Sequence, residues 1–69
     1  MSNGSVAKTF EISAESATSF EDAIRLGLER AGRTVEGIQG AWIAEQKVVV
    51  AAGQIVAYRV HMRVTFELK

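Results

Sequence analysis

Polar and apolar residues alternate near the start of this chain. Between residues 6 and 13, the apolar side chains Phe10 and Ile12 share one parity and polar side chains take the other. A period of two is typical of a β-strand that buries one face. The pattern predicts a strand over 6–13, preceded by a small, polar and disordered N-terminal stretch over 1–5.

A cluster of serines precedes a second pattern, in which apolar residues recur every three or four positions. Ser16 or Ser19 is suited to accept a hydrogen bond from the first free amides of a helix. A single apolar stripe follows, formed by Phe20, Ala23, Ile24, Gly27, Leu28, Ala31, Val35 and Ile38. This spacing predicts one amphipathic helix of about four turns. Gly32 or Gly37 can end the helix, and the continuation of the stripe favours Gly37 as its left-handed cap.

The rest of the chain has the pattern of two strands joined by a tight turn. Residues 41–50 are rich in Trp, Ile and Val, and residues 55–68 alternate between apolar and polar side chains. The short connection between them contains Gly53, which is typical of a β-hairpin. The order of elements predicts an α+β fold, β-α-β-β, in which a three-stranded antiparallel sheet packs on one amphipathic helix.

One helix can cover only one face of this sheet. If the hairpin turn is centred on residues 52–53, Trp42 lies opposite Arg63 and Gln46 lies opposite Arg59. The uncovered face then carries Gly40, Trp42, Ala44, Gln46, Arg59, His61, Arg63 and Thr65. Such a mixed face usually meets another subunit, a ligand, or both.

Length and composition point to self-association. A chain of 69 residues makes a single domain, here residues 6–69, and a domain of this size buries only about 60% of its unfolded surface. Because the chain has no Cys and one His, disulfides, thiolate metal sites and sites with two imidazoles from one chain are excluded. Oligomerisation is the remaining means of stabilising so small a domain.

Charge and hydropathy narrow the choice of partners. Eight basic and eight acidic residues give a net charge of zero, which argues against a nucleic-acid-binding module. No apolar run is long enough to span a membrane, and the first residues do not have the pattern of a secretory signal. We therefore expect a cytoplasmic protein without nucleic-acid or membrane partners.

Four stretches at fixed spacing carry a family resemblance. They are Ser19-Phe20-Glu21-Asp22-Ala23-Ile24, Arg30-Ala31-Gly32-Arg33-Thr34, Gly53-Gln54-Ile55, and the strand from Tyr58 to Leu68. This ordered set, with the element order, resembles the dodecins, small flavin-binding proteins that assemble as hollow spheres of twelve chains. The resemblance implies a non-catalytic homododecameric cage that binds, stores or buffers a small ligand.

The residues that contact flavin in typical dodecins are changed in this chain. In the family, a tryptophan six residues after the threonine at the helix end stacks on the isoalloxazine ring. Six residues after Thr34 stands Gly40, and Trp42 comes two positions later. Two strand positions keep the ring on the same face but move it by about 6.6 Å. A third-strand glutamine that bonds the edge of the flavin in the family falls on Arg59.

The resemblance therefore implies FMN, FAD or riboflavin as the cofactor, with weakened or altered binding. Arginine only donates hydrogen bonds, and it binds anions in a fork, so the face suits an anion or an anionic aromatic better than neutral riboflavin. The predicted ligand-binding residues are Trp42, Arg59, Gly40, Gln46 and Arg63. No catalytic or metal-binding residue is predicted.

Other interpretations of the same residues stay open. Trp42 and the arginines also fit a purely structural assembly, in which they lie at subunit contacts and the arginines pair with Glu45 or Glu67. A tryptophan beside arginine also resembles a stacking surface for single-stranded nucleic acid, which the net charge disfavours. The sequence suggests no histidine–acid partner for Ser13, so we do not expect an enzyme.

Overall fold

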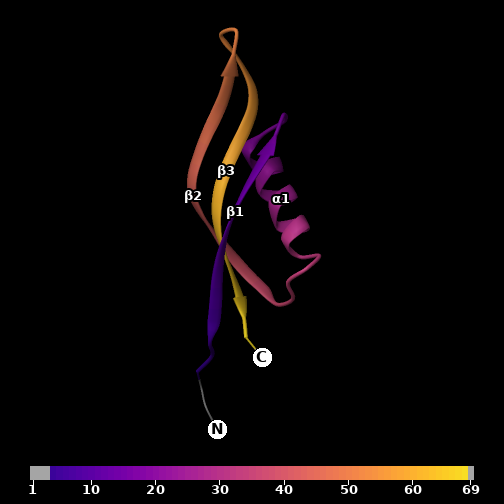
Figure 1. Cartoon of the computed structure of the whole chain (residues 1–69), viewed down its shortest axis with the longest axis vertical. Coiled ribbons are helices and arrows are strands. Elements are labelled where there is room, and N and C mark those ends of the chain that lie inside the picture. The colour runs from indigo at the N-terminus through magenta and orange to yellow at the C-terminus, as the bar shows by residue number, and fades with distance from the viewer. Residues whose placement is uncertain (1–3, 69) are drawn as a thin grey trace.

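The computed structural model describes residues 4–68 as a three-stranded sheet and one helix (Figure 1). The elements are β1 (Ala7–Ser16), α1 (Phe20–Ala31), β2 (Ile38–Ala51) and β3 (Gln54–Glu67). Both strand pairs are antiparallel, and the order across the sheet is β1-β3-β2. The predicted β-α-β-β order and α+β class are confirmed. Most of the stretch expected to be disordered, residues 1–3 of 1–5, lies outside the described residues.

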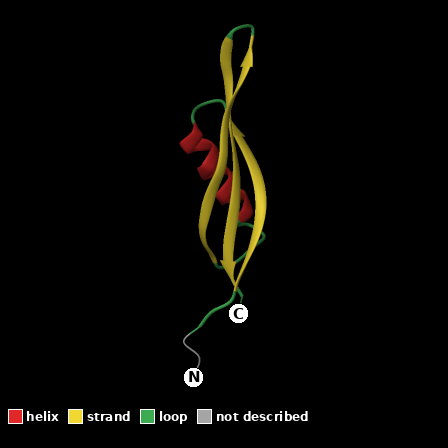
Figure 2. Ribbon diagram, turned by 90° about the vertical axis from the view of Figure 1, so that its left-hand side faces the viewer, coloured by secondary structure: helices red, strands yellow, loops and turns green. Residues whose placement is uncertain are grey.

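The helix packs on one face of the sheet, chiefly against β1 and β3 (Figure 2). The centre of the core consists of Ala23 from α1 and Val60, Met62 and Val64 from β3, all fully buried. Partly buried apolar residues surround it, namely Phe10, Ile12, Ala14, Phe20, Ile24, Leu28, Ile38 and Ile43. The core confirms the apolar parity predicted for the last strand. No helix within residues 4–68 is long and apolar enough to cross a membrane.

Ser19, rather than Ser16, caps the start of the helix. Its backbone is extended, and its Oγ accepts a hydrogen bond of 3.0 Å from the backbone N–H of Asp22. Ser16 ends β1 and is buried, where its Oγ donates to Asp22 Oδ2 at 2.7 Å. Both serines therefore fix the turn between β1 and α1.

The helix ends earlier than its apolar stripe predicts. Gly32 is the C-cap, and its N–H donates to Leu28 O, so the prediction that Gly37 caps the helix is wrong. The β-branched Val35 lies beyond the helix, and Ile38 begins β2 and packs on the core from there. Gly37, with a φ of 78°, turns the chain into β2. An apolar residue at helical spacing can thus serve a neighbouring strand.

The β2–β3 hairpin extends beyond the rest of the sheet, at the top of Figure 1. β1 pairs with β3 only as far as Tyr58, so residues 49–57, here called the hairpin arm, have no third strand beside them. The turn is centred on Ala52 and Gly53, as predicted, and both have positive φ angles, 52° and 75°. The arm contains no charged residue.

The pairing of β2 with β3 has three register shifts, and two of them cancel, while the third lies between Ile38 and Gly40. Of the two that cancel, one lies near Val50 and the other leaves Ala44 unpaired. Because the second shift reverses the first, Trp42 lies opposite Arg63, as predicted. Bulges of this kind re-aim the side chains that lie between them.

Between the two shifts, the predicted pairing is wrong. Lys47 lies opposite Arg59, and Gln46 lies opposite Val60. Gln46 therefore belongs to the parity of the helix-covered face and not to the uncovered one, because a one-residue slip moves a side chain to the other face. The prediction assumed a continuous ladder, and the sequence gives no clear signal for the shifts.

Candidate functional site

The face of the sheet that α1 leaves uncovered, here called the open face, gathers most of the polar chemistry of the strands. Because β3 is central, each of its outward side chains is flanked by one from β1 and one from β2. The resulting rungs are Glu15–Arg59–Lys47, Ser13–His61–Glu45, Glu11–Arg63–Trp42 and Thr9–Thr65–Gly40. The strand pairing thus brings acids from β1 and a lysine from β2 beside the predicted arginines.

Trp42 and Arg63 form a stacked pair on the open face. The guanidinium carbon of Arg63 lies 5.3 Å from the centre of the indole, within the range of a cation–π contact. Trp42 is 67% exposed, and within residues 4–68 Arg63 forms no ion pair. The pair therefore presents an aromatic surface and a positive charge side by side.

The rung beside this pair is open. Thr65 donates a hydrogen bond of 3.2 Å from Oγ1 to the carbonyl oxygen of Gly40. A Cβ built on Gly40 would meet only Thr65 Oγ1, at 3.9 Å. Gly40 thus leaves space next to Trp42 that a side chain or a ligand can occupy.

Arg59 is held by an acid from β1. Its Nε and Nη2 donate to Glu15 Oε1 at 2.9 and 2.6 Å. The interpretation that pairs the arginines with Glu45 or Glu67 is therefore wrong within this chain. The acid on β1 was missed because the pairing of β1 with β3 was not worked out residue by residue.

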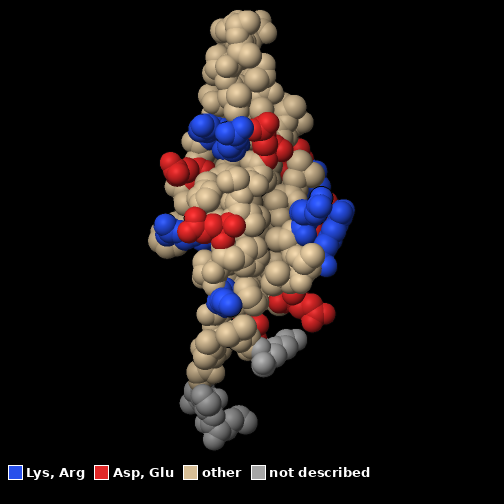
Figure 3. Space-filling model, in the orientation of Figure 1, with Lys and Arg blue, Asp and Glu red and all other residues tan. Residues whose placement is uncertain are grey.

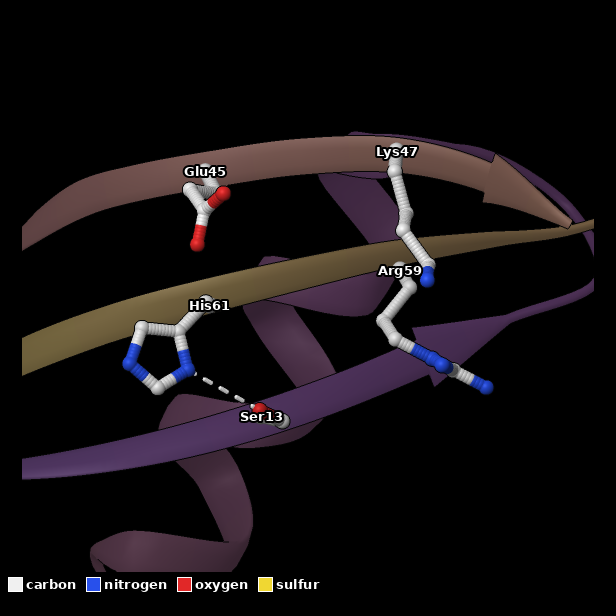
Figure 4. A pocket seen from close by; sticks show the side chains of 5 residues that line it. All are labelled: Ser13, Glu45, Lys47, Arg59 and His61. Atoms are coloured by element: carbon white, nitrogen blue, oxygen red, sulfur yellow. Dashed lines mark hydrogen bonds between the residues drawn. The ribbon is translucent and has the colours of Figure 1, made fainter.

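Lys47 flanks Arg59 on the other side and forms no ion pair within the described part of the chain. The two cations border a shallow depression of about 250 Å³, which is also lined by Ser13, Glu45 and His61 (Figure 4). On the face seen in Figure 3, charges of both signs are interspersed rather than separated into one basic field. The depression therefore has a lining of mixed charge, in which Lys47 is a cation without an ion pair among the described residues.

His61 bridges two side chains of β1. Its Nδ1 lies 3.0 Å from Ser13 Oγ, and its Nε2 lies 2.6 Å from Glu11 Oε1. The hydrogen bond and the charge of His61 hold the pKa of Glu11 below its usual value, with Arg63 adding a smaller effect. The sequence-based view of Ser13 as lacking a histidine–acid partner is wrong.

The structure thus brings four of the five predicted ligand-binding residues, Gly40, Trp42, Arg59 and Arg63, onto one face. Gln46 is not among them. The alternation of β1, which puts Glu11, Ser13 and Glu15 on its polar parity, was the signal for the missed residues. Among residues 4–68, no group of three or more His, Asp or Glu side chains is arranged to hold a metal ion.

Comparison with known proteins gives one family. The sequence model of the dodecin family matches residues 6–69. Among solved structures, the chain is similar to a dodecin from Streptomyces davaonensis, with a TM-score of 0.90 and 29% identity over 99% of this chain and 98% of that one. No curated protein matches.

Two further solved structures have the same fold. A point mutant of Thermus thermophilus dodecin has a TM-score of 0.89 and 27% identity over 96% of this chain and 98% of that one. A Mycobacterium tuberculosis antigen, described as calcium-chelating and as a calcium dodecin with a novel calcium-binding site, has a TM-score of 0.82 and 32% identity. That match covers 94% of this chain and 93% of the antigen.

Proposed function

The chain belongs to the dodecin family, and from that premise we propose that it assembles with eleven copies of itself and binds a small anionic aromatic ligand on the open face. Within the flavins, FMN and FAD suit this face better than riboflavin. The role is non-catalytic toward that ligand, as storage or buffering. The observation that carries the proposal is the exposed indole of Trp42 with the Arg63 guanidinium over it.

The stacked pair supplies the surface for an aromatic ring. A guanidinium is planar and can lie between two aromatic planes, so a ring placed on Arg63 completes a stack with Trp42. The open space at Gly40 gives such a ring room along the strand. Stacking of a ring on an aromatic side chain contributes about 1–3 kcal/mol.

The cations along β2 and β3 supply the preference for negative charge. Lys47 lies about 13 Å along the strands from Trp42, a distance that a phosphate on a flexible chain and the lysine stem can cover together. Arg63 forms no ion pair within the described residues, and its guanidinium can bind an anion. A phosphate-bearing flavin would therefore gain contacts that riboflavin lacks.

Titration of flavin fluorescence tests the proposal. We expect the protein to quench FMN and to bind it more tightly than riboflavin. Trp42→Ala should weaken FMN binding at least about tenfold, since 1.4 kcal/mol of lost stacking is a factor of ten, while Trp42→Phe should retain part of it. Arg63→Gln should weaken FMN more than riboflavin, and the matched control Arg33→Gln, in the loop after α1, should change neither.

A structural role is the second candidate, because an exposed indole on an uncovered sheet face also fits a subunit contact. In that case Trp42→Ala would dissociate the assembly in light scattering and the wild type would quench neither flavin. An intact assembly that loses FMN binding on the same substitution would instead support the ligand site.

A further inference from the structure

A hydrogen-bonded chain of three side chains on the open face is not used by the proposed ligand site. Ser13, His61 and Glu11 are joined by contacts of 3.0 and 2.6 Å, although β1 and β3 are far apart in sequence. The pairing of β1 with β3 places Ser13 directly opposite His61. Figure 4 shows the imidazole directed at the Ser13 hydroxyl.

When the imidazole is neutral, the carboxylate of Glu11 sets the direction of proton donation. The pKa of Glu11 lies below its usual value, so Glu11 is a carboxylate at neutral pH and can only accept. His61 Nε2 must then carry the hydrogen that it shares with Glu11. In the neutral imidazole, Nδ1 is left as the acceptor, and the Ser13 hydroxyl donates to it. A serine nucleophile needs this order of groups: hydroxyl, base, and an acid that orients the base.

The space next to Ser13 has the charge that acyl transfer requires. Ser13 and His61 line the same depression as Lys47 and Arg59. Negative charge that develops on a carbonyl oxygen there would be stabilised chiefly by the Lys47 ammonium, because Glu15 already holds the Arg59 guanidinium. A volume of about 250 Å³ admits a small acyl group. Glu45 also lines the depression and disfavours acyl groups that carry a carboxylate.

We propose that Ser13 is an acyl-accepting nucleophile that hydrolyses small, uncharged activated esters, with His61 as its general base and Glu11 as a positioning residue. Ser13 Oγ attacks the ester carbonyl carbon while its proton moves to His61 Nδ1. The C–O bond to the leaving alcohol or phenol then breaks, and that oxygen takes the proton from Nδ1. Water attacks the acyl-serine and gives a proton to Nδ1, which returns it to Ser13 Oγ as the carboxylic acid is released.

Hydrolysis of p-nitrophenyl acetate by the purified full chain tests this proposal. General-base assistance contributes about 10²–10⁴-fold, so Ser13→Ala and His61→Gln should each lower kcat/KM at least tenfold. Glu11→Gln should lower kcat with little change in KM, because it orients the base and does not touch the ester. The matched control is Thr9→Ala, which removes a hydroxyl from the same face of β1 without a histidine beside it, and it should keep the wild-type rate.

Covalent labelling supplies a second measurement. A fluorophosphonate probe should modify Ser13, identified by peptide mass spectrometry, and His61→Gln should reduce that labelling. Surface lysines and imidazoles also react with activated esters, so a rate that persists in Ser13→Ala, with the acetyl group on another side chain, would overturn the proposal. Circular dichroism and light scattering would show that each variant keeps its fold and assembly. Neither Trp42 nor Arg63 touches the ester, so assays made without added flavin separate this activity from flavin binding.

Discussion

The three cations of the open face have different roles because their partners differ. Glu15 holds Arg59, the indole lies beneath Arg63, and Lys47 forms no ion pair within residues 4–68. An exposed ion pair such as Arg59–Glu15 contributes only about 0–1 kcal/mol to stability. Its main effect is therefore to orient the guanidinium and to weaken its attraction for a ligand. Lys47 and Arg63 are left as the stronger contacts for an anion.

Glu11 makes the protein less stable at acid pH than at neutral pH. Because its folded-state pKa lies below the ordinary 4.5, the carboxylate stabilises the fold above that pH, and the contribution is lost as pH falls through the lowered pKa. Thermal unfolding between pH 7 and pH 3 should show a smaller acid-induced loss for Glu11→Gln than for the wild type. Glu45→Gln is the control, since Glu45 makes no hydrogen bond in the described part of the chain. If stability fell by the same amount with pH in Glu11→Gln and in the wild type, the loss in acid would not come from Glu11.

The residues of the candidate site could be predicted from the sequence only in part. Parity alone places Arg59, His61 and Arg63 together, because they alternate within one uninterrupted strand. It does not show that Ser13 lies beside His61, since that contact needs the register between two strands at opposite ends of the chain. Gln46 was misplaced because a single unpaired residue, Ala44, changes which face the following residues occupy.

Elements, in contrast, could be predicted almost completely. Strong periodicity within one segment fixes whether it is a helix or a strand, and the apolar parity of β3 fixes which face is buried. The ends were less certain, because Val35 and Ile38 satisfy helical spacing yet lie beyond α1. Ile38 continues the stripe past Gly32 because it packs on the core from the start of β2.

The start of α1 depends on one side chain. Ser19 Oγ accepts from the Asp22 amide, and replacing an N-cap serine with alanine typically costs about 1 kcal/mol. Ser19→Ala should therefore lower the free energy of unfolding by about that amount in urea denaturation. The adjacent Thr18→Ala, whose side chain forms no hydrogen bond in the described structure, should have a much smaller effect. Equal losses of unfolding free energy in the two variants would show that Ser19 does not act as the helix cap.

In the turn of the hairpin arm, Ala52 adopts a backbone conformation that alanine does not favour. Ala52 has a φ of 52°, in the left-handed region that costs an L-residue about 1–2 kcal/mol, and Gly53 follows with a φ of 75°. Asn-Gly is the preferred pair for a turn of this kind. Ala52→Asn should stabilise the protein by about 0.5–1 kcal/mol in urea denaturation. Ala51→Asn, at the end of β2, should give no such gain, and stabilisation by both would contradict the argument from φ.

The whole molecule exposes two surfaces that an isolated small domain does not normally leave in water. One is the open face, and the other is the hairpin arm, which projects beyond α1 and β1 (Figure 1). On the arm, Val50 and Ile55 are 57% and 53% exposed, and Val56 is also exposed. Exposed apolar patches and unpaired strand edges favour association. Closed symmetry would bury both surfaces without leaving free edges.

Light scattering after size-exclusion chromatography should therefore give one species of about 90 kDa for the wild type, twelve chains of 7.5 kDa each. Val50→Lys and Ile55→Lys should each shift the protein to smaller species, because burying an unpaired charge at an apolar contact costs several kcal/mol. Circular dichroism should show that the strands persist, since both positions are exposed within the chain. Glu36→Lys, in the polar loop between α1 and β2, is the control for added charge and should leave the assembly intact. A wild type at the mass of one chain would contradict the assembly, and an unchanged assembly in both arm variants would show that its contacts lie elsewhere.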